Sequence, residues 1–147
     1  MAKPTPEQAA QMLNSRAGGF NALIGLRFVR ASADEVVAEI PITTDLAQPY
    51  GLVHGGVYAS LVETICSVGA ACDVAERGGG AVGLDNHTSF LSAAKEGTLV
   101  GRATPLRKGR RTQVWEARIE DQRGKLVARG QVRMLVLDEG SSILNRA

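Results

Sequence analysis

A single carboxylate stands in an otherwise apolar stretch near the middle of the sequence. Glu63 is the only charged residue among the eighteen from Gly55 to Cys72. Burying an unpaired carboxylate costs much free energy, so a protein keeps one mainly for acid, base or nucleophile chemistry. Ser60 and Ser67, three residues before and four after Glu63, share its face of a helix. The same polar stripe also suits the solvent side of an amphipathic helix, and position alone does not choose between the two.

The three residues His54, Gly55 and Gly56 stand where this apolar stretch begins. A helix start offers unpaired N–H groups and the positive end of the helix dipole. Glycines allow a substrate to approach that backbone closely, so the segment suits an oxyanion hole for a thioester carbonyl. The alternative is a plain junction between loop and helix, with His54 as a structural hydrogen-bonding residue.

A basic cluster lies farther along the chain, where residues 107–111 read Arg-Lys-Gly-Arg-Arg. Four cations in a predicted hairpin loop suit phosphate groups, because guanidinium and ammonium groups donate charge-assisted hydrogen bonds to them. A solvated basic turn would look the same in sequence. The formal net charge of +2 is too small to indicate nucleic acid as a partner.

The predicted elements place these groups on a helix and on strands. Composition and a length of 147 residues fit one domain spanning residues 1–147. The periodicity predicts a long buried helix over about 56–76, whose apolar surface on nearly all sides needs a sheet around it. The expected fold class is therefore α+β, a long central helix wrapped by a curved antiparallel sheet, with the last four strands forming a meander. The other predicted elements are a short helix over 6–16, strands over 26–30, 35–41, 81–90, 98–106, 112–121 and 125–137, and a polar tail over 138–147.

The cysteines and the chain start bear on location and cofactors. Cys66 and Cys72 lie six residues apart, about 9 Å along a helix, which is too far for a disulfide. With no Cys-x-x-Cys pair or Cys/His cluster, we expect no zinc or other metal site and no cofactor. The first fourteen residues have no hydrophobic signal core, and we expect no membrane span, so the predicted location is the cytoplasm.

The run 51–56, Gly-Leu-Val-His-Gly-Gly, is followed by Glu63 nine residues after His54 and then by Ser67. This segment resembles the active-site segment of hotdog-fold acyl-CoA thioesterases, and most closely the PaaI-like branch with the Glu-dependent 4-hydroxybenzoyl-CoA thioesterases. The similarity continues through residues 82–83, 86–90 and 95–97 and covers roughly residues 20–137. The resemblance implies the hotdog fold, which agrees with the predicted order of elements, and it implies thioester hydrolysis.

The resemblance also assigns roles to the residues that match. Glu63 would be the nucleophile or general base, and the Gly55 N–H would polarise the thioester carbonyl. Gln48 would bind that carbonyl or orient the attacking water. His54 would support the helix start and the substrate, and Ser67 would assist the water or the leaving thiol. No metal or redox cofactor is implied, since coenzyme A is part of the substrate.

Coenzyme A binding follows from the resemblance as well. In related thioesterases the basic loop contacts the nucleotide, which implies Lys108, Arg110 and Arg111 as coenzyme A-binding residues. Ser89 and Phe90, in the matching segment 86–90, are the other coenzyme A-binding residues that the resemblance implies. This chain departs from the family at two places. Some relatives carry His where it has Phe90, which favours the branch acting on aryl-CoA, and relatives often carry Arg-Pro where it has Ser92-Ala93. The acyl group itself stays open.

The spacing of Gly55 and Glu63 has a consequence of its own. Eight residues along a helix span about 12 Å, so one carbonyl cannot touch both groups. If both act on one thioester, they come from two copies whose helices run antiparallel across a two-fold axis. The expected partner is thus a second copy of the chain. The family resemblance implies such dimers, often paired into homotetramers, and an acyl-CoA substrate, with no nucleic acid or membrane partner.

Two other functions share the fold. Hotdog hydratases and dehydratases also act on acyl thioesters, but the expected pattern spaces His and Glu differently and has a Pro-Gly-rich turn that is absent here. Some hotdog domains bind acyl-CoA without hydrolysing it and regulate transcription. The roughly 20 residues before the first strand leave no room for a DNA-binding module.

Overall fold

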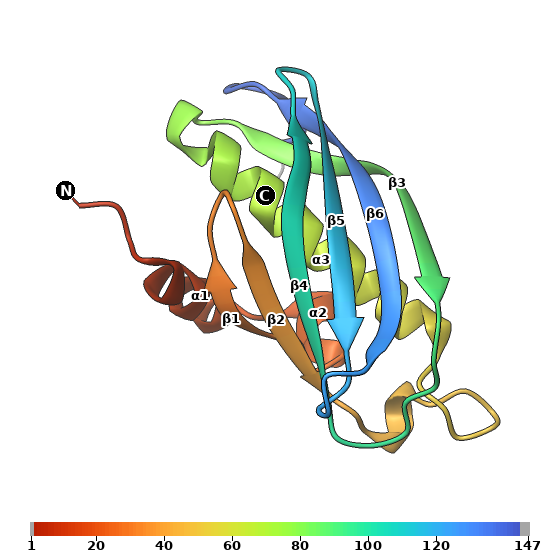
Figure 1. The fold of residues 1–147 in the computed structure, drawn as a ribbon. Coiled ribbons are helices and arrows are strands. Elements are labelled where there is room, and N and C mark those ends of the chain that lie inside the picture. The colour runs from red at the N-terminus through yellow and green to blue at the C-terminus, as the bar shows by residue number, and fades with distance from the viewer. Residues whose placement is uncertain (1, 145–147) are drawn as a thin grey trace.

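The computed structural model describes residues 2–144 and has one long helix, α3 (Gly55–Val74), enclosed by a curved sheet (Figure 1). At twenty residues, α3 is about 30 Å long. Its buried residues include Tyr58, Leu61 and Ile65, which face the sheet, and the short helix η2 (Ala75–Arg77) continues it. The predicted central helix and its sheet cover are confirmed.

The sheet has six strands in the order β1-β2-β4-β5-β6-β3, and every neighbouring pair is antiparallel. All six strands were predicted, with bounds that differ by no more than two residues. The bounds are β1 Arg27–Ala31, β2 Val36–Pro41, β3 Gly80–Phe90, β4 Thr98–Lys108, β5 Thr112–Glu120 and β6 Leu126–Leu137.

The predicted four-strand meander is wrong at its first strand. β3 pairs with β6, from Gly80 opposite Leu137 to Phe90 opposite Ala128, and not with β4. The connection over 91–97 passes below the ends of β5 and β6 before β4 begins (Figure 1). Alternation of apolar residues identifies a strand but not its partner, because the pairing depends on which sheet edge α3 leaves open. Placed beside β6, β3 covers the face of α3 that carries Glu63.

The N-terminal helix α1 (Pro6–Ser15) begins at a capping box between Thr5 and Gln8, close to the predicted bounds. The Asn14 side chain of α1 accepts from the Phe28 N–H at 2.9 Å and donates to the Phe28 carbonyl at 2.8 Å. This amide covers part of the outer edge of β1. Two short helices were not predicted, α2 (Gly19–Leu23) and η1 (Thr44–Leu46).

The segment Gly55–Arg77 is long and apolar enough to cross a membrane, with a mean hydropathy of 1.4. The expectation that no stretch approaches a membrane span was therefore too simple. In the structure, α3 packs against all of the strands, and half of this window is buried inside the fold. The apolar surface of α3 thus serves the core of this domain.

After β6, residues 138–144 form turns at the end of the molecule where β3 begins. The Leu144 side chain lies against Gly80, where a Cβ would come within 2.6 Å of it. Residues 145–147 of the predicted polar tail lie outside the described residues.

The packing of α3 on the sheet depends on Gly69 and Trp115. Trp115 is fully buried, and a Cβ on Gly69 would lie 2.4 Å from its ring. The Trp115 Nε1 donates to Gln113 at 2.8 Å, and Gln113 donates to Asp73 of α3 at 2.7 Å. The indole therefore sets the distance between helix and sheet, and its polar end is satisfied.

We predict that Gly69→Ala lowers the free energy of unfolding by about 1–3 kcal/mol, because the added methyl group overpacks against the Trp115 ring. Urea denaturation followed by tryptophan fluorescence measures this. Gly18→Ala is the matched control, because no atom lies within 4 Å of a Cβ built there. A Gly69→Ala protein as stable as the wild type would contradict this view of the packing.

Candidate active site

One backbone donor is left free where α3 begins. The His54 Nδ1 accepts from the Gly56 N–H at 2.8 Å, which makes His54 the N-cap of α3, and the Val57 N–H donates to the His54 carbonyl at 2.9 Å. Among the described residues, no acceptor is recorded for the Gly55 N–H. His54 thus caps the helix start, and the Gly55 N–H is the donor that stays available there.

Gln48 lies beside this donor, on the loop that leads into α3. The loop closes through the Gln48 N–H and the Leu52 carbonyl at 2.7 Å, with Gly51 at a positive φ of 78°. The Gln48 Oε1 accepts from the Tyr50 N–H, so the amide NH₂ is the end that remains to donate. Gln48 and Gly55 line the same cleft, of about 360 Å³. Two donors therefore converge on one space, which suits a carbonyl oxygen.

The Glu63 carboxylate lies half-buried between α3 and β3. Its Oε1 accepts from the Ser67 hydroxyl at 3.3 Å, and its Oε2 accepts from the Asn86 amide at 3.0 Å. A Cβ on Gly83 would come within 2.2 Å of Oε1, so only glycine at this position of β3 leaves room for the carboxylate. Ser60 of the predicted polar stripe turns away from Glu63 and donates to the Gly56 carbonyl at 2.6 Å.

Within one protomer, the carbonyl-binding cleft and the carboxylate are separate. Glu63 does not line the cleft that Gln48 and Gly55 share. Eight helical residues between Gly55 and Glu63 correspond to about 12 Å along α3. The Gly55 N–H and the Glu63 carboxylate of one protomer thus lie at two levels of the same helix.

Strand β3 has an open outer edge, in contrast to β1. It lies at one end of the strand order, and no described residue pairs with its outer side. The exposed side chains along it include Leu84, which is 46% exposed next to a bulge in the pairing with β6. Figure 1 shows β3 running beside α3 at this free edge. The side of α3 that carries Glu63 therefore meets the boundary of the protomer.

Comparison with known proteins identifies the family. Residues 50–128 match the model of the Thioesterase superfamily, which is more than half of the chain. A Mycobacterium tuberculosis H37Rv protein with the name "Putative esterase" is 36% identical over 138 residues, covering 92% of this chain and 97% of that one. The chain belongs to the thioesterase superfamily.

Two further relatives give the activity and the fold of this group. The 1,4-dihydroxy-2-naphthoyl-CoA hydrolase of Escherichia coli K12 is 33% identical over 121 residues, covering 82% of this chain and 88% of that enzyme. A thioesterase from Haemophilus influenzae superposes with a TM-score of 0.85 at 28% identity, covering 96% of each chain. The predicted α+β hotdog fold and the predicted activity as a thioester hydrolase are confirmed.

The basic hairpin of this thioesterase divides into paired and free cations. Lys108 forms ion pairs with Asp34 at 3.0 Å and with Asp73 at 3.2 Å. Partial burial lowers the pKa of the Lys108 ammonium, but the hydrogen bonds to both carboxylates outweigh it, so the pKa is raised. Arg110 and Arg111 are exposed, and no ion pair is recorded for them among residues 2–144. Lys108 therefore anchors the hairpin to α3, while the two arginines stay available.

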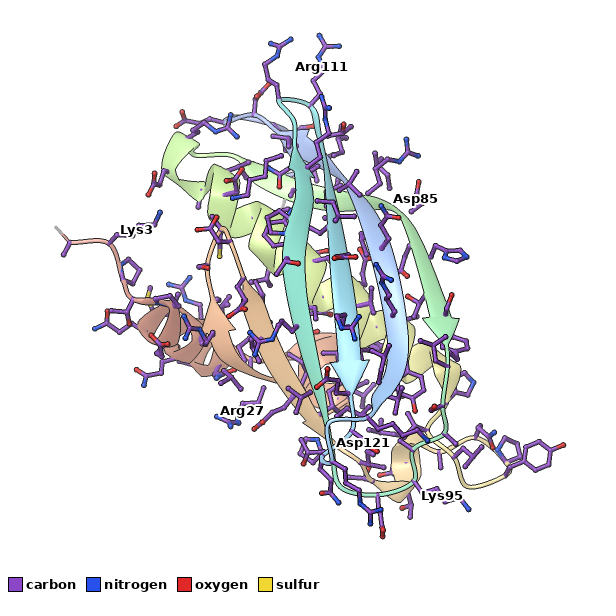
Figure 2. The ribbon with its side chains drawn as sticks, viewed as in Figure 1. Lys3, Arg27, Asp85, Lys95, Arg111 and Asp121 are labelled. Carbon is purple, nitrogen blue, oxygen red and sulfur yellow. The ribbon has the colours of Figure 1, made fainter. Side chains whose placement is uncertain are left out.

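The hairpin and the start of α3 lie at opposite ends of the thioesterase. Figure 2 shows Arg111 at the tip of the β4–β5 hairpin and Lys95 at the other end of the sheet. The Lys108–Asp73 contact places the hairpin base near the end of α3, and eighteen residues from Gly55 to Asp73 span about 27 Å. The predicted nucleotide-binding residues are therefore not beside the predicted carbonyl-binding residues of the same protomer.

Ser89 and Phe90, both predicted to bind coenzyme A, point to opposite faces of β3. Phe90 lines the cleft with Gln48 and Gly55, and its ring lies 5.9 Å from that of Tyr58. Ser89 lines a different hollow, on the outer face of the sheet, together with His87. Successive residues of a strand alternate between faces, so one ligand group does not contact both side chains.

The two thiols are not placed as nucleophiles. Cys66 and Cys72 are both unpaired, as predicted. Burial raises the pKa of each thiol, which disfavours the reactive thiolate. Neither side chain contacts the cleft at Gly55.

Sequence reasoning missed Asn86 and Thr88 as residues of the site. Both lie on β3 and point toward α3, and Thr88 donates to the Asn86 Oδ1 at 2.7 Å. Their alternation is a signal, since two polar residues fall on the strand face that meets an apolar helix. The sequence alone does not show which face of β3 lies against Glu63, so this alternation does not identify the two residues in advance.

Proposed function

We propose that the chain hydrolyses an aryl- or acyl-CoA thioester at a site made by two copies. The Gly55 N–H of one protomer binds the thioester carbonyl, and Glu63 of the other acts as nucleophile or general base. The observation that carries this proposal is a free helix-start donor and a half-buried carboxylate on one helix, about 12 Å apart.

The carbonyl end of the site uses preorganised donors. In this proposal the thioester oxygen accepts from the Gly55 N–H and from the Gln48 NH₂, where negative charge develops as the carbonyl is attacked. The positive end of the α3 dipole adds to the stabilisation. Both donors are fixed before substrate arrives, Gly55 by the His54 cap and Gln48 by the Tyr50 N–H.

Glu63 completes the reaction in one of two ways. As nucleophile, a carboxylate oxygen bonds to the carbonyl carbon, the carbon–sulfur bond breaks, and coenzyme A leaves as a thiolate that takes a proton. Water then hydrolyses the mixed anhydride. As general base, Glu63 takes a proton from the water that attacks the same carbon, the carbon–sulfur bond then breaks, and the leaving thiolate takes up a proton. Ser67, which donates to Oε1, helps to hold the carboxylate in either case.

The second copy is argued from the open edge of β3. An exposed edge strand of eleven residues is a template for pairing, and natural proteins cover such edges. Two β3 strands related by a two-fold axis would place two α3 helices antiparallel, bringing Gly55 of one level with Glu63 of the other. In this proposal the dimer is the minimal unit. Pairing of dimers into a tetramer, the absence of any cofactor and a cytoplasmic location stay predictions.

The same arrangement brings a basic hairpin to the nucleotide. If Gly55 of one copy is level with Glu63 of the other, the distance along the helix from that level to Asp73 of the second copy is ten residues, about 15 Å. The hairpin of the same protomer is about 27 Å from its own Gly55 by the same measure. We therefore assign the coenzyme A phosphates to Arg110 and Arg111 of the second copy and leave Lys108 out, because two carboxylates already bind it.

An aromatic acyl group is the proposed substrate class. The Phe90 and Tyr58 rings line the cleft beside Gly55, and none of the described residues around it is charged. Aromatic side chains favour an aromatic ligand through offset or edge-to-face contacts. The naming of relatives from Escherichia coli and Listeria monocytogenes as 1,4-dihydroxy-2-naphthoyl-CoA hydrolases supports the same class.

We predict that Glu63→Ala lowers kcat for benzoyl-CoA by about 10²–10⁴-fold, because the proposed nucleophile or general base is lost. Release of free thiol measures hydrolysis, which hydration of an enoyl thioester would not produce. Glu120→Gln on β5 is the control, because it removes a carboxylate outside the site. Near-normal thiol release by the Glu63→Ala protein would contradict the proposed role of Glu63 in hydrolysis.

A shared site predicts complementation between two inactive chains. Gln48→Ala and Glu63→Ala each damage both sites of a homodimer. A heterodimer of the two variants, purified through a different tag on each chain, should regain about half of the wild-type turnover, because one of its two sites is intact. No gain over the parent variants would show that each site lies within one chain.

For the hairpin, we predict that Arg110→Ala/Arg111→Ala raises KM for benzoyl-CoA by about tenfold or more, because charge-assisted contacts to phosphate are lost. KM for the benzoyl thioester of N-acetylcysteamine, which lacks the nucleotide, should stay unchanged. Arg118→Ala/Arg129→Ala on the outer sheet face is the matched control. An equal rise for both substrates would argue against phosphate binding.

A further inference from the structure

The Glu63 carboxylate is held at both of its oxygens, by two residues from different elements. Ser67 donates to Oε1 from the next turn of α3, and Asn86 donates to Oε2 from β3. The Asn86 Nδ2 also donates to the Ala59 carbonyl at 3.1 Å. Ala59 lies one turn before Glu63, so the Asn86 amide joins the carboxylate to the backbone of its own helix.

A second layer fixes which end of the Asn86 amide faces Glu63. The Thr88 hydroxyl donates to the Asn86 Oδ1 at 2.7 Å, so the oxygen of the amide is occupied and its NH₂ faces the carboxylate. Gly130, paired with Thr88 across β3 and β6, leaves the space for that hydroxyl, since a Cβ there would lie 2.6 Å from it. A chain of contacts thus runs from β6 through β3 to the carboxylate on α3.

We propose that Asn86 is a positioning residue for Glu63, and that Thr88 acts through Asn86 by setting the orientation of its amide. This inference rests on the proposed function, because it gives Glu63 the role in hydrolysis stated above. A glutamate has three side-chain torsions, and free rotation would carry its oxygens away from a carbonyl bound by another protomer. Asn86 holds one arrangement before the substrate binds.

The geometry separates this role from a purely structural one. Asn86 is an exposed residue of an edge strand, and its backbone pairs with Val132 whatever its side chain is. Its side-chain hydrogen bonds lead only to Glu63, Ala59 and Thr88 among the described residues. Removing the amide therefore frees the carboxylate and gives up one hydrogen bond to the α3 backbone, while the apolar side chains that pack α3 on the sheet stay in place.

The test compares variants at 86 and 88 by thiol release from benzoyl-CoA, with KM and kcat determined separately. Asn86→Ala should lower kcat by about 10–100-fold with KM unchanged, since a misplaced catalytic group costs turnover more than binding. Asn86→Asp keeps the acceptor for Thr88 but places a second carboxylate beside Glu63, so its kcat should be lower than that of Asn86→Ala. Asp85→Ala is the control and should keep the wild-type kcat, because Asp85 precedes Asn86 on β3 and its carboxylate pairs with Arg133 instead of Glu63.

Thr88→Val tests the second layer. It should lower kcat less than Asn86→Ala does, and adding it to Asn86→Ala should lower kcat no further, because Thr88 acts only through the amide. Full additivity of the two changes would overturn the role of Thr88. Thermal unfolding and light scattering of each variant should give the wild-type Tm and oligomeric state.

Three outcomes would overturn the role of Asn86. These are a wild-type kcat in Asn86→Ala, a rise in KM with kcat unchanged, or a loss of activity that follows a lower Tm or a dissociated oligomer. The Glu63→Ala protein separates this failure from that of the proposed function. If Glu63→Ala is inactive and Asn86→Ala is normal, only the positioning role is lost; if Glu63→Ala is active, both proposals are.

Discussion

The structure depends on keeping the carboxylate of Glu63 half-buried on α3, the helix that the sheet encloses. An acidic group in that position needs hydrogen-bond donors, because the apolar surroundings offer no compensation for lost water. α3 supplies one donor, Ser67, and β3 supplies the other, Asn86. β3 must also come close enough to supply it, and Gly83 allows that approach. The pairing of β3 with β6 therefore extends the sheet and also places Asn86 within hydrogen-bond distance of Glu63.

The direction of α3 places the free backbone donor and the carboxylate at different positions along the helix. A helix presents free N–H groups only at its start, and here the His54 cap leaves the Gly55 N–H as the donor without a recorded acceptor among the described residues. Glu63 lies two turns later, where the sheet can reach it. A rigid helix cannot bring its first residue, Gly55, next to a residue eight positions later. The proposed site therefore takes its carbonyl donor and its carboxylate from two copies of the chain.

Much of this arrangement could be predicted from the sequence, and the rest could not for identifiable physical reasons. The apolar run around Glu63 predicted α3, and alternation predicted all six strands, because these patterns depend on burial along one element. The position of β3 in the sheet depends on contacts between elements, and alternation does not encode it. Asn86 was missed for the same reason. Lys108 looked like its basic neighbours in sequence, yet Asp34 and Asp73, far away along the chain, pair with it.

The pairing of Lys108 also explains how a hairpin of like charges can be both held and available. Four cations in five residues repel one another, and a loop that only solvated them would adopt many conformations. Two carboxylates neutralise Lys108 at the base and fix the hairpin to the end of α3, next to the Gln113–Trp115 contacts that set the spacing of helix and sheet. The arginines at the tip then extend from a fixed base with their guanidinium groups exposed. The same helix thus orders the free Gly55 N–H at its start, the Glu63 carboxylate in its middle and the base of the arginine hairpin at its end. In the proposed dimer, antiparallel pairing of two such helices would align all three groups along one extended thioester.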